Sequence, residues 1–351
     1  MTPLRVWWAS RLGVALLVVA AAHRTRGFLE GWDSWDVTIL RSIAQFGYDG
    51  YPEHYADEDV AAFFPGFPLV LRLFHLVIPS WTAAGLVVSL VAGAFACVYL
   101  ARLASLDDVD GGWAVVGLVL SPYAVFLAAG YSEALFLALA LPGWLAARRG
   151  HWAAAALLVA GACTVRVSGL FLAVALVVQW AVTSRAPRAL PWLAAPFMAL
   201  LGYAAYLRWL SGDWLRWVHA QEHGWNRSFA WPWEAFRTTW DAAWHGSYSP
   251  EYTWSFRAEI AAVLIGAVVT LVLVRRRAWG EATYVGLSVG ALATSSFYLS
   301  VARATLLWFP LWLLLGSALD RRPWVRWGYV AVSTPLMAAG VLTFHSGRWV
   351  G

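Results

Sequence analysis

Seven carboxylates stand close together near the N-terminal end of the chain, in a polar stretch between two apolar segments. The stretch runs from Trp32 to Leu69, and its acids are Asp33, Asp36, Asp49, Glu53, Asp57, Glu58 and Asp59. A carboxylate beside a hydrocarbon layer is costly unless it does work in the water at the edge of that layer. We therefore expect one of these acids to do chemistry, as the acceptor of a proton.

Asp36 is the first candidate for that role because it lies in the Trp-flanked segment WDSWD. Asp33 precedes it by three residues, so the two acids would share one face if the segment is helical. The acidic run at 57–59 is expected to be covered by solvent and to take no part in catalysis. The alternative for Asp36 and Asp33 is that they cap a short helix and face water, as most acids in loops do.

Glu133 stands at the start of a predicted helix, in the segment GYSEALF. A carboxylate at the mouth of a membrane helix is expensive without a partner, so we expect Glu133 to order a substrate or to hold an arginine. The alternative is an acid that the helix dipole favours at a helix start, with Ser132 as the cap.

Arg166 and Arg303 stand at predicted helix ends and are flanked by apolar residues rather than by other basic ones. A guanidinium offers paired N–H donors to phosphate oxygens and stabilises the charge of a departing phosphate. We therefore predict that both arginines bind phosphate. The alternatives are that their side chains extend to the membrane interface or form a salt bridge with Glu133.

Membrane helices must position these residues, because the composition excludes a soluble globule. The 351 residues are 61% hydrophobic and 13% charged, with a mean hydropathy of +0.61. The 25 Trp and 13 Tyr exceed what a core needs, and such rings favour the two membrane interfaces. The net charge of +5 comes from arginines in loops and indicates no nucleic-acid partner.

The sequence predicts no metal site and no cofactor. Cys97 and Cys163 lie inside apolar runs, where a free cysteine behaves as a small hydrophobe, so no disulfide is expected either. The histidines of the predicted outer loops lack metal-ligand spacing, and we interpret them as polar surface or substrate contacts: His54, His219, His223 and His245.

Basic loops set the predicted orientation. They lie at 148–149, 185–188, 275–277 and 321–326, on alternate loops, and the positive-inside rule makes them cytoplasmic. An outer acidic stretch then allows only one crossing before Arg102, and 82–103 is the better candidate for it. Segment 61–79 is broken by prolines, so we predict an interfacial or re-entrant helix there on the outer face.

The resulting fold class is an all-α polytopic membrane protein, a single domain over residues 1–351 with a cytoplasmic N-terminus and about eleven transmembrane helices. Two outer loops stand out, a catalytic one at 24–80 and a Trp-rich one at 211–256 in which we expect short interfacial helices. The predicted spans are 6–22, 82–103, 113–129, 132–147, 151–165, 168–184, 190–210, 257–274, 281–300, 303–318 and 325–344.

The order and wording of several motifs resemble one family. These motifs are the WD and IAxxGY between Trp35 and Tyr48, then AFFPGFPL, SPYAVFLAAGYSEALF, CTVRVSGL, GDWLRWVHAQEHGWNR and RATLLWFPL. Over nearly the whole chain they look like the mannosyltransferase II family of glycosylphosphatidylinositol (GPI) biosynthesis, the PIG-V type, in its bacterial branch. That family is similar in fold to the glycosyltransferase C superfold.

The resemblance implies a reaction and a place for it. The expected donor is polyprenyl phosphate mannose, whose single phosphate needs no divalent metal, and the expected acceptor is a hydroxyl of a glycolipid or glycan. Transfer with inversion would take place on the extracytoplasmic side of the plasma (inner) membrane, with Asp36 as the single base and Arg303 and Arg166 on the donor phosphate. The eukaryotic family is thought to work with a second protein, so a partner subunit is possible, but the sequence identifies none. Substrate contacts are expected from Asp33, Trp35, Phe64, Pro65, Tyr131, Ser132 and Glu133.

Four positions depart from the family pattern: Ser34, Ile39, Ser168 and Ala304 replace its usual Arg, His, Asn and Tyr. These changes bear on the identity of the acceptor and, less directly, of the sugar. A polytopic transporter or flippase for lipid or sugar is the alternative function. It would place ionisable residues near the midplane and usually show an inverted repeat, whereas the charges here lie in predicted outer loops and the two halves do not resemble each other.

Overall fold

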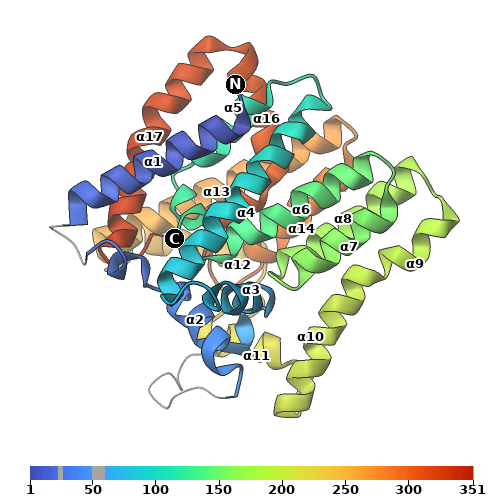
Figure 1. Cartoon of the computed structure of the whole chain (residues 1–351), viewed down its shortest axis with the longest axis horizontal. Helices are drawn as coiled ribbons and strands as arrows, with labels where there is room; N and C mark the ends of the chain where they lie inside the picture. The colour runs from blue at the N-terminus through green and yellow to red at the C-terminus, as the bar shows by residue number, and fades with distance from the viewer. Residues whose placement is uncertain (23–26, 50–59, 351) are drawn as a thin grey trace.

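The computed structural model of the chain describes residues 1–22, 27–49 and 60–350, and most of these residues are helical (Figure 1). Within these ranges there is no β-sheet, and one isolated antiparallel bridge joins Phe229 and Ser295. The predicted all-helical class is confirmed. Helices satisfy their backbone hydrogen bonds internally, which is the condition for crossing a bilayer.

The α-helices of the described ranges follow one another in this order: α1 Pro3–Ala22, α2 Asp36–Phe46, α3 Gly66–His75, α4 Trp81–Ser105, α5 Gly111–Val119, α6 Ser132–Arg148, α7 Trp152–Cys163, α8 Ser168–Thr183, α9 Leu190–Leu193, α10 Ala195–Ser211, α11 Arg216–Trp225, α12 Pro232–Trp244, α13 Pro250–Arg275, α14 Trp279–Ala293, α15 Val301–Ala304, α16 Phe309–Arg321 and α17 Pro323–His345.

Five helical stretches are long and apolar enough to cross a membrane. They are Pro3–Ala21, Trp81–Ser105, Pro187–Ser211, Pro250–Arg275 and Pro323–His345. A sixth candidate is the broken pair Val301–Leu307 and Phe309–Arg321, which bends by 75°. The chain is therefore a polytopic membrane protein. The number of eleven spans stays a prediction, because helices such as α7 and α8 are shorter than a bilayer crossing usually requires.

Two predicted spans are interrupted. In the span predicted at 113–129, helix α5 ends at Val119 and a short 3₁₀ helix, η4 (Ala124–Leu127), follows. Pro122 lies between them, and proline disfavours helix both at its own position and at the residue before it. In the last third of the chain, α16 starts anew after Trp308 with Pro310 in its first turn, where the missing N–H is tolerated.

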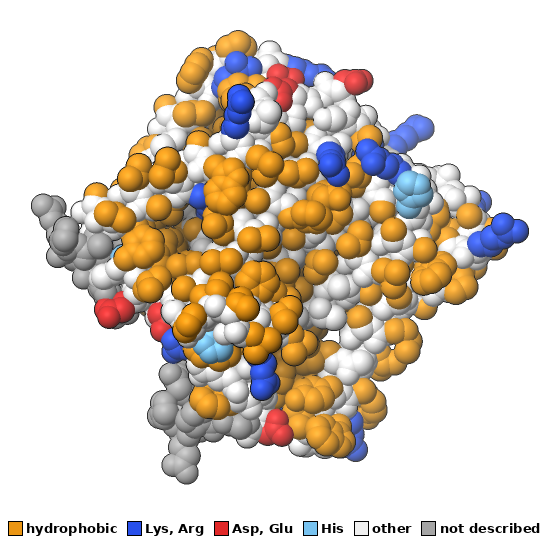
Figure 2. Space-filling view, viewed as in Figure 1, with side chains coloured by type: hydrophobic (Ala, Val, Ile, Leu, Met, Phe, Trp, Pro, Cys, Tyr) orange, Lys and Arg blue, Asp and Glu red, His pale blue; other side chains and the backbone are white. Residues whose placement is uncertain are grey.

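Helix α6 lies in the interior of the bundle. Its side chains Phe136, Leu141 and Trp144 are fully buried, whereas Leu12 and Leu16 of α1 are each 61% exposed. Apolar side chains cover most of the middle of the molecular face in Figure 2, and charged ones gather toward its edges. Such an apolar exterior is what a bundle surrounded by lipid presents.

The two ends of α6 mark two ends of the molecule. At its C-terminal end, Arg148 pairs with Asp107 at 3.0 Å and with Glu281 at 3.3 Å. A cavity of about 540 Å³ at this end is also lined by Arg276 and Arg321, so three of the four basic loops meet there. This arrangement agrees with loops that alternate between two sides, and which side faces the cytoplasm stays a prediction.

Short helices build the other end. The predicted segment 61–79 contains the ten-residue helix α3, whose Phe67 and Leu71 are buried, while its Leu69 and Leu73 are exposed. The region 211–256 contains the short helices α11 and α12. A helix with one buried and one exposed apolar face suits an interface position, although the placement of these helices at a membrane surface stays a prediction. The acids Glu53, Asp57, Glu58 and Asp59, and His54, lie outside the described residues.

Candidate active site

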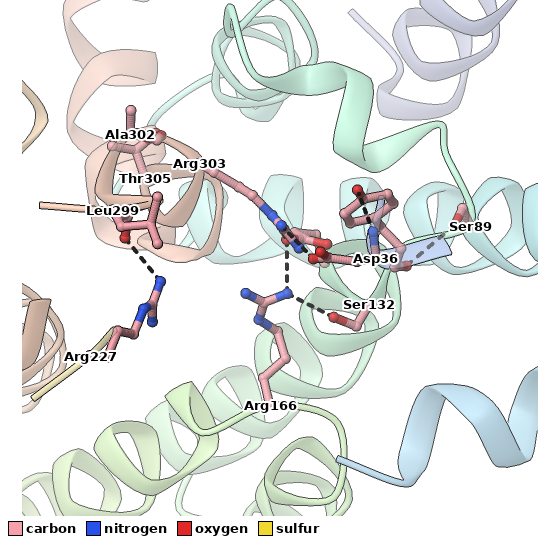
Figure 3. A network of polar contacts seen from close by, with 11 residues as sticks. Asp36, Ser89, Ser132, Arg166, Arg227, Leu299, Ala302, Arg303 and Thr305 are labelled. Atoms are coloured by element: carbon pink, nitrogen blue, oxygen red, sulfur yellow. Dashed lines mark hydrogen bonds and ion pairs between the residues drawn. The ribbon is translucent and has the colours of Figure 1, made fainter. Parts of the chain in front are cut away.

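A network of charged side chains lies at the N-terminal end of α6 (Figure 3). Arg303 donates from Nη1 to Asp36 Oδ2 at 2.7 Å and from Nε to Glu133 Oε1 at 2.5 Å. Arg166 donates from Nη1 to the same Glu133 oxygen at 2.8 Å and to Ser132 Oγ at 2.7 Å. The side chains of Glu133, Arg303 and Asp36 are 0%, 6% and 14% exposed, so these ion pairs are poorly screened by water.

Two aromatic rings contact the charged residues of this network. The guanidinium carbon of Arg303 lies 4.5 Å from the ring centroid of Tyr131 and 4.6 Å from that of Phe126, within the range of a cation–π contact. The backbone N–H of Asp36 donates to the Tyr131 hydroxyl at 3.2 Å. Tyr131 therefore orients both partners of the Asp36–Arg303 ion pair.

Asp36 is placed by the abrupt start of α2. Trp35, directly before the helix, has a φ of +58°, which is strained for a bulky side chain. Its ring packs against Trp349 near the C-terminal end of the described chain, with centroids 5.0 Å apart. The turn at Trp35 makes Asp36 the first residue of α2 and directs its carboxylate to Arg303.

Arg303 is carried by the four-residue helix α15. Glu259 of α13 accepts the backbone N–H groups of Ser300, Val301 and Ala302 at 2.9, 2.6 and 3.1 Å. Ser300 itself has a φ of +61°, so the chain turns sharply before the helix begins. A buried carboxylate that satisfies three amides at once fixes the start of α15 and thereby the origin of the Arg303 side chain.

Arg166 lies in the turn between α7 and α8, which is joined to the start of α3. The N–H of Gly66 donates to the carbonyl of Thr164 at 2.7 Å. A Cβ at position 66 would lie only 2.7 Å from that carbonyl oxygen, so the close approach requires glycine. This contact holds the segment AFFPGFPL against the turn that carries Arg166.

The network opens into a small cavity of about 140 Å³. Its polar lining consists of Asp36, Ser132, Arg166, Gln221, Arg227, Ser300 and Arg303, and its apolar lining includes Phe63, Phe64, Trp217, Trp225 and Trp349. Charged groups and aromatic rings that line one pocket are what an amphipathic substrate with an ionic centre requires.

Two larger cavities lie near this site. One of about 1010 Å³, between α12 and α13, is lined by Glu259, His245 and again by Trp349. The other, of about 440 Å³, is lined by residues of α2, α3 and α10, among them Pro65, Arg72 and Tyr203. Trp349 thus lines both the small charged cavity and the cavity of about 1010 Å³.

The structure brings together most residues predicted for the site. Asp36, Phe64, Ser132, Arg166 and Arg303 line the small cavity, and Glu133 and Tyr131 contact its charged residues from behind. Glu133 was predicted to order a substrate or to hold an arginine. The structure shows it holding two arginines, Arg303 and Arg166. Trp35 and Pro65 lie beside the cavity rather than in its wall.

Asp33 is directed elsewhere. It forms an ion pair with Arg41 and does not line the small cavity. The chain between Asp33 and Asp36 is not helical, because a 3₁₀ turn ends at Trp32 and α2 begins only at Asp36. The shared helix face considered for these two acids is therefore absent, and a substrate contact of Asp33 stays a prediction.

Two residues of the site were missed in the sequence. Arg227 lines the cavity and donates from Nη2 to the Leu299 carbonyl at 3.0 Å, and Glu259 holds α15. The position of Glu259 could have been recognised from the sequence, because an acid inside the apolar span predicted at 257–274 is unfavourable without hydrogen-bond or ion-pair partners. The signal for Arg227 is weaker, because it is one of three arginines, with Arg216 and Arg237, in the Trp-rich segment 211–256.

Two histidines of the predicted outer loops pair with acids in the structure. His219 pairs with Asp213 at 2.7 Å, and His245 pairs with Asp241 at 3.4 Å. Throughout the described part of the chain, no three His, Cys, Asp or Glu side chains are placed to hold a metal ion. The expectation that the reaction needs no metal stays a prediction.

Curated relatives match part of the chain. A GPI alpha-1,6-mannosyltransferase 2 from Cricetulus griseus is 37% identical over 160 residues, which cover 41% of this chain and 30% of the relative. The proteins of the same name from Homo sapiens and Mus musculus are each 35% identical, over 158 and 167 residues. These matches span about a third of the relatives' length, 30% and 32% respectively.

No solved structure matches the chain, so the likeness to the glycosyltransferase C superfold stays a prediction. A family model does match: residues 12–184 fit the one described as Mannosyltransferase (PIG-V). This region carries Asp36, Ser132, Glu133 and Arg166, whereas Arg227, Glu259 and Arg303 lie beyond it. Through residues 12–184, about half of its length, the chain is therefore similar to the mannosyltransferase (PIG-V) family.

Proposed function

We propose that the chain is a membrane mannosyltransferase that moves mannose from polyprenyl phosphate mannose to a hydroxyl of a glycolipid or glycan acceptor, with inversion. The relatives are named for transfer to GPI, and an inositol glycolipid is one acceptor of this class. The site faces the extracytoplasmic side of the plasma membrane in this proposal. A partner subunit is not required by the chemistry.

The observation that carries the proposal is the joint placement of Asp36 and three arginines around one cavity at an end of the bundle. Asp36 Oδ2 is held by Arg303, and Asp36 Oδ1 has no hydrogen-bond partner in the described ranges. One free carboxylate oxygen beside guanidinium groups provides a proton acceptor next to an anion site.

The reaction follows from these roles. The acceptor hydroxyl gives its proton to Asp36 while its oxygen forms a bond to the anomeric carbon of mannose. The bond from that carbon to the phosphate oxygen breaks, and the phosphate leaves with the electron pair. Arg166 and Arg303 stabilise the charge that develops on the departing polyprenyl phosphate, which is negatively charged throughout. Attack and departure on opposite faces invert the anomeric centre.

Substitution of the base tests the proposal. Purified protein in detergent is incubated with radiolabelled polyprenyl phosphate mannose and a lipid extract of the source cells, and labelled glycolipid is measured. Asp36→Asn should lower transfer at least about 100-fold, since a general base contributes roughly 10² to 10⁴. Asp107→Asn, at the opposite end of the molecule, should retain activity.

The same assay separates the enzyme from a transporter. A transporter forms no labelled product in detergent, because it needs a sealed compartment to have an effect. Product formation by the wild-type protein together with near-normal turnover by Asp36→Asn would show that a mannosyltransferase uses a different base.

A further inference from the structure

Arg227 has N–H donors that no described group accepts. It lies between α11 and α12, and its Nη2 donates to the Leu299 carbonyl at 3.0 Å. Its Nε is buried without a hydrogen-bond partner, and no carboxylate lies within 4.0 Å of it among the residues described. A buried donor without an acceptor is unfavourable, so an anion that binds there gains a hydrogen bond from Arg227.

The other two arginines of the cavity are already engaged. Arg303 uses Nε and Nη1 on Glu133 and Asp36, and Arg166 uses Nη1 on Glu133 and Ser132. Asp36 and Glu133 therefore balance two of the three guanidinium charges around the cavity. Arg227 supplies the third charge, which has no ion-pair partner in the cavity wall.

Glu259 is the remaining acid in this neighbourhood, and its charge acts on Arg227 through space without a direct ion pair between the two. Its carboxylate accepts three backbone N–H groups and lines the larger cavity. Burial lowers the pKa of Arg227 to about 10, so its guanidinium is protonated at neutral pH. No carboxylate among the described residues of the cavity wall contacts Arg227, so its buried Nε is available to an anionic ligand.

Arg227 and Asp36 lie on opposite sides of the network in Figure 3, with Arg303 and Arg166 between them. An inverting displacement requires the base and the leaving group on opposite faces of the reacting carbon. The position of Arg227 is therefore that of a group that holds the leaving phosphate.

We propose that Arg227 is the principal anchor of the donor phosphate, gripping together with Arg166 the singly charged phosphodiester of a polyprenyl phosphate sugar. This assignment rests on the proposed function and changes the roles within it. Arg303 chiefly orients Asp36, and its remaining Nη2 adds a secondary contact to the phosphate.

Binding of the lipid phosphate alone tests the assignment. Radiolabelled polyprenyl phosphate is titrated into purified full-length protein in detergent, and its dissociation constant is measured. Arg227→Gln should raise the constant about 10-fold or more, since hydrogen bonds to charged groups contribute about 1.5 to 3 kcal/mol. Arg227→Lys, which keeps the charge but not the paired donors, should have a smaller effect.

Matched controls exclude indirect effects. Arg237 of α12 has an 86% exposed side chain, and Arg237→Gln should bind polyprenyl phosphate like the wild type. Neutral polyprenol should bind the wild type and Arg227→Gln equally, because only the phosphate contact is lost. Inorganic phosphate and phosphatidylglycerol serve as competitors, and equal competition by phosphatidylglycerol would overturn the prenyl assignment.

The outcomes are separable. If the wild type does not bind polyprenyl phosphate, the proposed donor is wrong. If the wild type binds it and folded Arg227→Gln binds it within twofold, the anchor is wrong while the proposed function stands. Should Arg227→Gln fail to fold, Arg227→Lys decides, and an unchanged constant for that variant contradicts paired-donor binding.

Discussion

Glu133 receives two guanidinium groups on one oxygen. Its Oε1 accepts from Arg303 and Arg166, and its Oε2 is buried without a hydrogen-bond partner in the described chain. Removing three charges from water carries a large desolvation penalty. Loss of one partner usually destabilises the protein by more than the intact ion-pair group stabilises it, because the remaining charges stay buried and unpaired. Glu133 is therefore a residue on which both the stability and the geometry of the site depend.

Glu133→Gln should destabilise the protein and lower transfer together. The amide removes the charge that balances Arg303 and Arg166, and loss of one member of a buried ion pair costs about 3 to 5 kcal/mol. Thermal unfolding in detergent and the mannosyl transfer assay provide the two measurements.

Glu222→Gln is the matched control, because Glu222 lies on the exposed side of α11 and forms no ion pair with a described residue. It should match the wild type in both measurements. A Glu133→Gln protein with wild-type stability would contradict the buried network.

The residues of the site differ in how far the sequence reveals them. Asp36, Glu133, Arg166 and Arg303 stand in recognisable motifs, and each is a charge next to apolar residues, which is a visible anomaly. Arg227 ends the motif GDWLRWVHAQEHGWNR, but it lies in a segment with several other charged residues, where an arginine is unremarkable. Only the fold shows that it reaches the cavity of the others, because that requires the α11–α12 turn to pack against Leu299.

Helix α15 is too short to be stable by itself, and its position depends on Glu259. Four residues make too few internal hydrogen bonds to offset the cost of helix nucleation. The three N–H groups accepted by Glu259 compensate for this at the start of the helix. The helix in turn carries Arg303, so α13 determines the geometry of the site from a distance.

Glu259→Gln should lower transfer about tenfold or more while the bundle remains folded. An amide offers one acceptor oxygen and places an NH₂ group against at least one of the three donors, at a cost of about 1.5 to 3 kcal/mol. The turnover number, measured at saturating donor with the folded fraction checked by size-exclusion chromatography, gives the result.

Glu251→Gln, on the same helix, is the control. Glu251 forms a half-exposed pair with Arg348 at 2.7 Å, and exposed pairs contribute little. Turnover by Glu259→Gln equal to that of Glu251→Gln would show that α15 does not need its carboxylate clamp.

Helix boundaries were predictable from the sequence where a long apolar run determines them. They were less predictable where the backbone changes direction. Spans such as 82–103 agree closely with α4 because a long apolar run has no competing structure in a bilayer. The start of α15 at Val301 and the start of α2 at Asp36 depend on tertiary partners, namely Glu259 and Tyr131. Neither partner is adjacent in sequence, so periodicity alone does not reveal them.

The whole molecule has one basic end and one end that carries the candidate site. Asp108, in the loop between α4 and α5, belongs to the basic end, and Arg237 of α12 belongs to the other end. Both positions are exposed, and the native Cys97 and Cys163 are buried, so introduced cysteines can be labelled selectively.

A membrane-impermeant maleimide should label Arg237→Cys in intact cells and Asp108→Cys only after permeabilisation. This expectation follows from the positive-inside rule applied to the basic end. The opposite labelling pattern would place the active site on the cytoplasmic side and would contradict the proposed orientation. The cysteine-containing wild type, unlabelled in both conditions, is the control.

Trp349 bears on how the protein should be handled in the laboratory. Its indole touches Trp35 and borders both the charged cavity and the large apolar one, only two residues from the last position of the chain. A bulky group attached next to Trp349 would obstruct both cavities. The amino group of Met1 lies at the basic end, and its exposed ion pair with Asp110 contributes little to stability. An affinity tag is therefore better attached at Met1.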